Sequence, residues 1–148
     1  QLDRFLMRLE LGYPDPAAER EMFQRADSAH LPDKAKTCIS TDQLHTIRRA
    51  VRQVHASENL LDYLQRVVAY TRRSPEFAVG LSPRGALALL DSAKAWAVMN
   101  SRGHLVPEDI QVVLPAVASH RLVPSSEFSG DSGALVELLQ RNVDVINP

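Results

Sequence analysis

A well-formed helix start stands in the middle of this chain, directly before a long run rich in Ala and Leu. Ser82 is a favourable N-cap residue, because its hydroxyl can accept a hydrogen bond from a free amide of the first helical turn. Pro83 suits the first helical position, since the amide hydrogen that proline lacks would have no partner there. We therefore expect a central helix over residues 83–100. Its apolar face would carry Leu87, Leu90, Ala93 and Ala97.

Arg84 is the anomaly in this helix start, because a cation in the first turn opposes the helix dipole at a cost of roughly 0.3–1 kcal/mol. A bound anion would offset that cost, since phosphate accepts hydrogen bonds both from free amides and from a forked guanidinium. Gly85 adds no side chain, so a ligand could approach the backbone closely. The alternative is a solvated surface arginine beside an ordinary cap.

Most of the remaining chain has helical patterns as well. Asp15 followed by Pro16 predicts a short helix over residues 17–25, and Ser40 or Thr41 can begin the next one. The inward face of that second helix would carry Leu44, Ile47, Val51 and Val54. Ser57 can cap a third helix, whose inward positions would be Leu60, Leu61, Leu64, Val67, Val68 and Thr71. Loops are expected over residues 26–40 and 72–81.

The C-terminal part of the chain predicts two more helices. Gly103 suits the end of the central helix, and Pro107 with two following acids opens the next one. Pro115 should kink or split that helix, because it removes one helical hydrogen bond. Residues 124–133 read as a linker before a last helix over residues 134–145.

Residues 5–11 are the exception to the helical pattern. Apolar and other side chains alternate along this stretch, which predicts a strand. One side would carry Phe5, Met7, Leu9 and Leu11, and the other Leu6, Arg8 and Glu10. The breaker cluster of residues 12–16 would end this strand.

Composition narrows the class of protein. The length of 148 residues with 45% hydrophobic residues fits one domain with a real core. The net charge of −1 provides no overall basic field for nucleic acid, so no nucleic-acid partner is expected. A single cysteine, Cys38, excludes an internal disulfide. We find no run of 18 apolar residues and no signal peptide in the sequence, so we expect no membrane segment and a cytoplasmic location.

Four stretches together resemble MoxR-type AAA+ ATPases. Residues 80–90, followed by Ala93-Lys94-Ala95-Trp96-Ala97, resemble the second-sensor helix of that family. Residues 1–5 resemble the end of its ATPase core, residues 54–63 the start of a lid helix, and residues 106–122 the last lid helices. The resemblance covers nearly the whole chain, and Leu81 departs from it, standing where the family more often has a small residue.

The resemblance implies a mainly α fold, an AAA+ lid-type helical bundle preceded by one strand from the α/β ATPase core. Residues 1–16 would be the terminal strand and linker of the core, residues 17–123 the helical lid, and residues 124–148 a linker and C-terminal helix packing on the lid. The chain begins without Met and within a motif, so we expect a C-terminal fragment of a larger ATPase. Without the rest of its sheet, the strand would present an unpaired edge.

The resemblance also implies roles for individual residues. Arg84 would be the nucleotide-sensing arginine, with Ser82 and Gly85 completing a nucleotide-binding set. Arg4 resembles an arginine finger that reaches the nucleotide of the adjacent subunit, and the alternative is a salt bridge at a strand end. Tyr63 could lie near the adenine, but an aromatic residue on a helix is more often part of a core.

The implied function is the lid domain of an ATPase that couples ATP hydrolysis to chaperone-like remodelling or maturation of protein complexes. The implied assembly is a homo-oligomeric ring, often a hexamer, with client proteins or von Willebrand factor A-domain proteins as partners. ATP is the implied cofactor, and its Mg²⁺ would be held by the missing core. No Gly-x-x-x-x-Gly-Lys-Ser/Thr loop occurs in the sequence, so the chain by itself should not hydrolyse ATP.

Other functional classes have weaker signals. Arg48, Arg49 and Arg52 form a basic cluster, so the alternative function is a non-enzymatic helical module that binds protein or DNA. A solvated helix face explains the cluster better, because the whole chain is not basic and no aromatic residues interleave with the arginines. The five histidines lack the spacing of a metal site, so no metal is expected. A stand-alone enzyme is disfavoured, because no nucleophile–base pair is evident.

Overall fold

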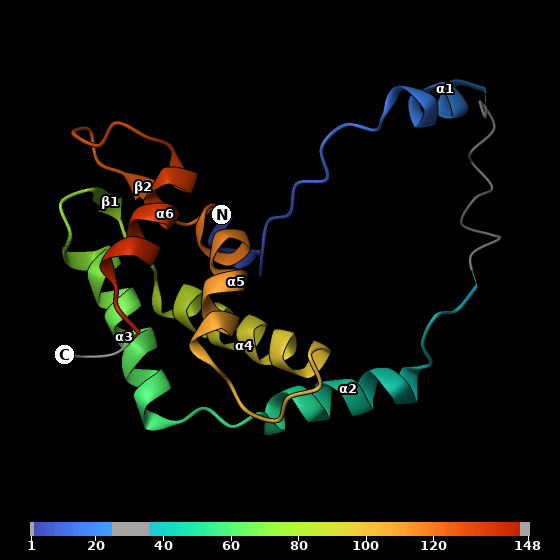
Figure 1. Cartoon of the computed structure of the whole chain (residues 1–148), viewed down its shortest axis with the longest axis horizontal. Helices are drawn as coiled ribbons and strands as arrows, with labels where there is room; N and C mark the ends of the chain where they lie inside the picture. Colours follow the sequence, from blue (N-terminus) through green and yellow to red (C-terminus); the bar gives the residue numbers. More distant parts are fainter. Residues whose placement is uncertain (1, 25–35, 146–148) are drawn as a thin grey trace.

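The computed structural model describes residues 2–24 and 36–145 and is mainly helical (Figure 1). The elements run in the order η1 (Leu2–Arg4), α1 (Pro16–Gln24), α2 (Thr41–Gln53), α3 (Glu58–Arg73), β1 (Phe77–Val79), α4 (Pro83–Met99), α5 (Pro107–Ala118), β2 (Val123–Pro124) and α6 (Ser132–Asn142). The predicted mainly α fold class is confirmed. Among the described residues, none of the helices has both the length and the apolar character needed to cross a bilayer.

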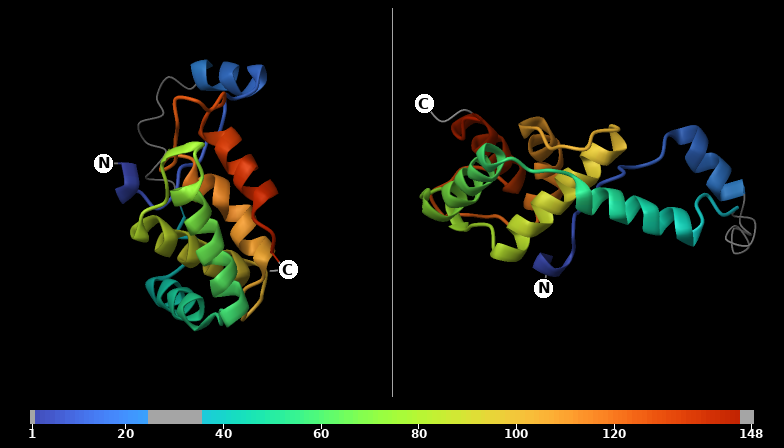
Figure 2. Two further views of the ribbon diagram at one scale, coloured as in Figure 1. Left: turned by 90° about the vertical axis from the view of Figure 1, so that its left-hand side faces the viewer. Right: turned by 90° about the horizontal axis from the view of Figure 1, so that it is seen from below.

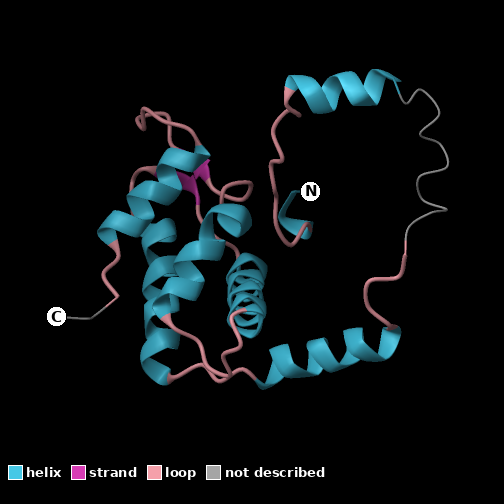
Figure 3. Cartoon of the chain, turned by 45° about the vertical axis from the view of Figure 1, so that its right-hand side comes forward, coloured by secondary structure: helices cyan, strands magenta, loops and turns pink. Residues whose placement is uncertain are grey.

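The hydrophobic core lies among α3, α4, α5 and α6. The central helix α4 packs chiefly against α5 and also contacts α2 and α3. Its buried side chains are mostly small, among them Ala93 and Ala97, which lets neighbouring helices approach closely. Helix α2 extends outward from this bundle, and α1 lies apart from it, as Figure 1, the right-hand view of Figure 2 and Figure 3 show. No residue of α1 or α2 is buried, so the bundle begins in effect at Val54.

The predicted helix starts are confirmed by their caps. The hydroxyls of Ser57 and Ser82 accept the amides of Leu60 and Gly85, at 3.3 and 3.0 Å. Ser40 forms a full capping box at the start of α2. The last helix begins slightly earlier than predicted, because the Asp131 carboxylate accepts the amide hydrogen of Ala134 and caps α6.

The predicted strand over residues 5–11 is wrong. These residues follow η1 as an exposed chain without strand pairing, and the Arg8 amide donates its hydrogen bond to the Ala116 carbonyl of α5 at 2.8 Å. A strand needs a neighbouring backbone to satisfy its donors and acceptors, which an alternating pattern alone does not supply. Of the alternating apolar side chains, Met7 packs against the core, whereas Leu9 and Leu11 are exposed.

Three details of the helices also differ from prediction. Leu87 is 63% exposed instead of facing the core. The left-handed residue after α4 is Ser101, with φ of 57°, so Gly103 does not end that helix. Helix α5 continues through Pro115 without splitting and ends at Ala118.

The inward face predicted for α2 is only partly covered. Leu44 and Val51 are half-buried and Ile47 is exposed, while Val54 belongs to the core. The helix itself forms as predicted, because its cap and heptad spacing are local properties. The predicted loop over residues 26–40 lies largely outside the described residues.

A short strand pair joins two segments that were predicted as a loop and a linker. Strand β1 pairs antiparallel with β2, with Phe77 opposite Pro124 (Figure 3). The turn after β1 lies tightly against α3, where a Cβ at Gly80 would come within 2.3 Å of the Thr71 carbonyl oxygen. The buried Thr71 hydroxyl accepts the Leu81 amide hydrogen at 3.0 Å and donates to the Val68 carbonyl at 2.7 Å. These contacts fix the turn that leads into α4.

Candidate functional site

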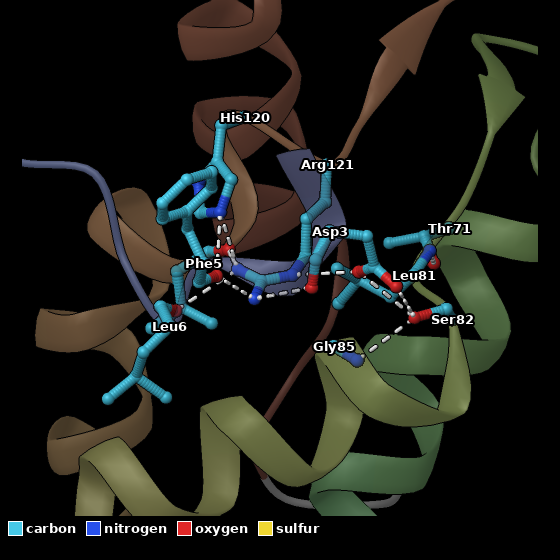
Figure 4. Close-up of polar contacts among 10 residues, drawn as sticks. Asp3, Phe5, Leu6, Thr71, Leu81, Ser82, Gly85, His120 and Arg121 are labelled. Atoms are coloured by element: carbon cyan, nitrogen blue, oxygen red, sulfur yellow. Dashed lines mark hydrogen bonds and ion pairs between the residues drawn. The ribbon is translucent and has the colours of Figure 1, made fainter. Parts of the chain in front are cut away.

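The Asp3 carboxylate connects η1 to the start of α4 and to the turn that follows α5 (Figure 4). The Ser82 hydroxyl lies 3.0 and 3.2 Å from the two carboxylate oxygens, and it donates to this acceptor. Arg121 Nε donates to one carboxylate oxygen at 3.0 Å. One side chain of η1 therefore joins the cap of α4 to an arginine that lies 118 residues further along the chain.

Arg121 is a buried cation whose guanidinium is almost fully surrounded by acceptors. Its side chain is only 2% exposed, so its charge requires hydrogen-bond partners inside the protein. Besides Asp3, these partners are the main-chain carbonyls of Asp3, Phe5, Leu6 and Val117 and the ring nitrogen Nε2 of His120 (Figure 4). The segment after η1 is thus held to α5 by the arginine rather than by strand pairing.

The structure gives Ser82 and Gly85 clear local roles. The Ser82 hydroxyl accepts the Gly85 amide hydrogen while donating to Asp3, so it is fully used within the protein. A Cβ at Gly85 would lie 3.1 Å from Arg121 Cδ and 3.3 Å from Leu81 Cδ2. The missing side chain of Gly85 therefore makes room for Arg121.

Arg4 and Arg84, the two arginines singled out from the sequence, line the same surface recess of about 560 Å³. Its other lining residues are Asp3, Leu6, Leu87, Ala88, Asp91 and Arg121. Within residues 2–24 and 36–145, neither Arg4 nor Arg84 has a hydrogen-bond or ion-pair partner, and both are exposed. The fold therefore brings together two guanidinium groups without ion-pair partners, in a recess that also holds the Asp91 carboxylate. They lie beside the N-terminus of α4, where the helix dipole also favours an anion.

A second buried ion pair, between Arg102 and Asp109, lies at the turn between α4 and α5. The Asp109 side chain is 1% exposed and is held by both terminal nitrogens of Arg102, at 2.5 and 2.6 Å. Burial alone would raise the pKa of Asp109, but hydrogen bonds from Arg102 and the Val106 amide, together with the charges of Arg102 and His104, hold that pKa below its ordinary value of 3.8. This pair closes the turn and lies outside the recess.

The remaining sequence candidates lie elsewhere. Tyr63 is 2% exposed, and its hydroxyl accepts a hydrogen bond from Gln111 at 3.4 Å, so its ring packs in the core. The arginines of the basic cluster, Arg48, Arg49 and Arg52, are exposed on α2. Cys38 is a free, exposed thiol. In the part of the chain that the structure describes, no group of three or more His, Cys, Asp or Glu residues is placed to hold a metal ion.

Asp3 and Arg121 are the residues that sequence reasoning missed. Both lie inside stretches quoted for their family resemblance, but neither stood out as a site residue. Their pairing depends on a contact between distant parts of the chain, which spacing along the sequence does not reveal.

Comparison with known proteins identifies the helical bundle. Residues 69–140 match the family of AAA lid domains. The chain is 34% identical over 140 residues to "Chaperone MoxR1" of Mycobacterium tuberculosis, covering 88% of this chain and 37% of that protein. It is 33% identical over 132 residues to "Uncharacterized protein YeaC" of Bacillus subtilis, covering 88% of this chain and 41% of that protein.

A solved structure agrees with these relatives. A protein of Cytophaga hutchinsonii, provisionally named an ATPase, superimposes with a TM-score of 0.81 at 26% identity, over 99% of this chain and 48% of that one. The chain therefore spans less than half the length of each of these relatives. The part of the bundle from the end of α3 to α6, residues 69–140, is an AAA lid domain, and the chain that carries it is of the MoxR type of AAA+ proteins.

Proposed function

We propose that this chain acts as the lid of a MoxR-like AAA+ ATPase, contributing to ATP binding and coupling ATP hydrolysis to chaperone-like remodelling or maturation of protein complexes. The observation that carries the proposal is the shared recess, in which Arg4 and Arg84 lie unpaired beside the start of α4. Two guanidinium groups next to a helix N-terminus suit a polyphosphate better than any neutral ligand.

Arg84 is the proposed nucleotide-sensing residue. Its exposed guanidinium leaves the first turn of α4 and enters the recess, so a γ-phosphate there would offset the unfavourable position of a cation at the helix start. Ser82 and Gly85 complete the proposed nucleotide-binding set by holding this helix start in place. Loss of the γ-phosphate would release Arg84 and change the position of the lid.

Arg4 is the proposed arginine finger, acting on the nucleotide of a neighbouring subunit. Phosphoryl transfer spreads negative charge over the γ-phosphate oxygens, and an arginine supplied in trans can raise the rate about 10³- to 10⁵-fold. The alternative predicted from sequence, a salt bridge at Arg4, has no partner among the described residues. Arg4 is therefore available to an external anion.

The wider assembly follows as part of the same proposal. The chain lacks a phosphate loop, so ATP and its Mg²⁺ would be held mainly by an ATPase core, with this lid adding the arginine contacts. Neighbouring subunits would form a homo-oligomeric ring, a hexamer in the arrangement we favour, in the cytoplasm. Client proteins or von Willebrand factor A-domain proteins would be the partners.

The test is ATP hydrolysis by the full-length ATPase carrying Arg84→Ala or Arg4→Ala. We expect Arg84→Ala to lower kcat about 10²-fold, as removal of one preorganised donor does, and Arg4→Ala to lower it about 10³-fold or more. Arg73→Ala is the matched control, because this exposed arginine ends α3 outside the recess. It should retain nearly all activity.

A mixing experiment tests the trans role of Arg4. Subunits with Arg4→Ala but an intact phosphate loop are combined with subunits that retain Arg4 and have an inactive phosphate loop. Recovery of hydrolysis in the mixed rings supports a finger that crosses the subunit boundary. Wild-type rates in both single variants would instead mean that these arginines are structural, and the proposed function would have to be abandoned.

A further inference from the structure

We propose that Asp3 is a positioning residue that couples the Arg4 segment to the start of α4, so that a displacement of Arg84 is passed to Arg4. This inference rests on the proposed function, since it concerns how the two arginines are held relative to each other. It assigns to Asp3, Ser82 and Arg121 a shared task, and we refer to these three side chains as the Asp3 latch.

The first support is the place of Asp3 in the chain. Asp3 directly precedes Arg4 in η1, and its carboxylate accepts from the Ser82 hydroxyl, which belongs to the N-cap of α4 two residues before Arg84. Each arginine is therefore within two residues of one end of the same hydrogen bond. A rotation of the first turn of α4 would pull on η1 through this bond.

The second support is the scarcity of other connections between η1 and α4. After η1 the chain is held through Arg121 and the Arg8 amide, and both of these contacts lead to the end of α5. The hydrogen bond between Asp3 and Ser82 is the direct polar link from η1 to α4 within the described residues. Without it, no polar contact of η1 with α4 would remain among the described residues.

The third support is the way in which Arg121 orients Asp3. Arg121 Nε donates to the carboxylate oxygen that lies 3.2 Å from the Ser82 hydroxyl, and the same guanidinium also donates to the Asp3 carbonyl. An acid held by a buried arginine keeps one orientation, whereas a carboxylate that is 43% exposed and has no such partner would sample several. The latch is therefore built to hold a fixed spacing.

Asp3→Asn in the full-length ATPase is the first test. The amide keeps the size of the side chain but weakens both contacts, so we expect kcat to fall about 10- to 100-fold, as small misplacements of catalytic groups do, while KM changes about threefold or less. Asp62→Asn is the matched control, because it removes an equal charge from an exposed position on α3 that does not line the recess. An equal fall in kcat in Asp3→Asn and Asp62→Asn would mean that the loss of a charge alone is the cause, and it would overturn the latch.

Ser82→Asp combined with Asp3→Asn is a rescue experiment. If Asp3 and Ser82 had only separate structural roles, the second substitution would not restore the kcat that the first one lowers. Aspartate caps helices as well as serine does, so α4 should still begin correctly, but two carboxylates would then face each other across the latch. Asp3→Asn in the same chain replaces one of them by a donor and should recover about tenfold in kcat over Ser82→Asp alone. Thermal unfolding confirms that each variant is folded.

The outcomes separate this inference from the function on which it rests. If Arg4→Ala and Arg84→Ala lose activity but Asp3→Asn hydrolyses ATP at the wild-type rate, the arginines act without the latch and this inference is wrong. If Arg4→Ala and Arg84→Ala are themselves fully active, the proposed function fails. The latch is supported when Asp3→Asn loses kcat, Asp62→Asn does not, and the double variant recovers.

Discussion

Gln140 of α6 donates a hydrogen bond of 3.0 Å from its side-chain amide to the main-chain carbonyl of Gln111 in α5. In a regular helix this carbonyl would accept the amide hydrogen of residue 115, four residues further on, but Pro115 has no amide hydrogen. The helix therefore runs on through its proline, with the free acceptor satisfied from a neighbouring helix.

Gln140→Ala should lower the free energy of unfolding by about 0.5–1.5 kcal/mol, the usual value of one such hydrogen bond. In a Pro115→Ala background the carbonyl has its own helical donor again, so the same Gln140 substitution should cost clearly less. Urea unfolding of the four chains in this double-mutant cycle measures the coupling between the two residues. Equal costs in both backgrounds would show that Gln140 does not replace the missing donor.

Arg102→Ala should destabilise the fold strongly, by about 3–5 kcal/mol, because it leaves the buried Asp109 carboxylate without its charge partner. Asp109→Asn should cost less, since Arg102 is 28% exposed and can turn to water. Chemical denaturation of both variants at neutral pH gives the comparison. A larger loss of stability in Asp109→Asn than in Arg102→Ala would contradict the idea that an unpaired Asp109 carboxylate is the costlier of the two buried charges.

The same pair predicts how stability changes in acid. The pKa of Asp109 is lowered in the folded state, so its contribution is complete above the unfolded pKa of about 4 and is lost as the pH falls through the folded pKa. Unfolding measured from neutral pH into this acid range should show the wild type and Asp109→Asn approaching each other in stability. A constant difference over that range would contradict the lowered pKa.

Gly80→Ala should be strongly destabilising, by about 1–3 kcal/mol, because its Cβ would lie 2.3 Å from the backbone oxygen of Thr71, which cannot move aside without distorting α3. Gly103→Ala is the matched control, since a Cβ there meets nothing within 4 Å. Its effect should stay within about 0.5 kcal/mol. Thermal melting of the two variants distinguishes a close backbone approach from a general preference for glycine in loops.

Thr71→Val should cost about 1–3 kcal/mol, because it keeps the shape of the side chain but leaves the buried Leu81 amide without an acceptor. Thr71→Ser keeps the hydroxyl and should lose less. Hydrogen exchange at the Leu81 amide, compared with the melting of each variant, checks whether this bond is the cause. Unchanged protection of that amide in Thr71→Val would rule the explanation out.

The sequence predicted the features that depend on a few neighbouring residues. Ser57 and Ser82 are caps because a hydroxyl and a nearby amide are enough to form one, and both lie within a single turn. The strand over residues 5–11 failed for the opposite reason. Its alternation is a local pattern, but a strand exists only beside another backbone, and here the Arg8 amide bonds to α5 instead.

The candidate site was predicted in part for the same physical reason. Arg84 could be singled out because a cation at a helix start conflicts with the local dipole. Spacing could not predict that Arg84 and Arg4 line one recess. The contact that brings their two segments together joins Asp3 to Ser82, and these residues are 79 positions apart in the chain. Arg121 was missed because the sequence alone does not distinguish a buried arginine from an exposed one. The distinction depends on the acceptors that surround the guanidinium in the fold.

The docking of η1 against the ends of α4 and α5 has a consequence for how the chain tolerates changes in length. From Arg8 to Ile39, no described side chain is buried, while residues 2–7 and the bundle are joined through Arg121. Changes of length within residues 9–24 or 36–39 would therefore disturb no buried side chain, and each doubling of the length of a connection costs only about 0.6 kcal/mol. Insertions and deletions should accumulate there, whereas a shift of one residue between Asp3 and Leu6 would remove the acceptors that Asp3, Phe5 and Leu6 supply to Arg121.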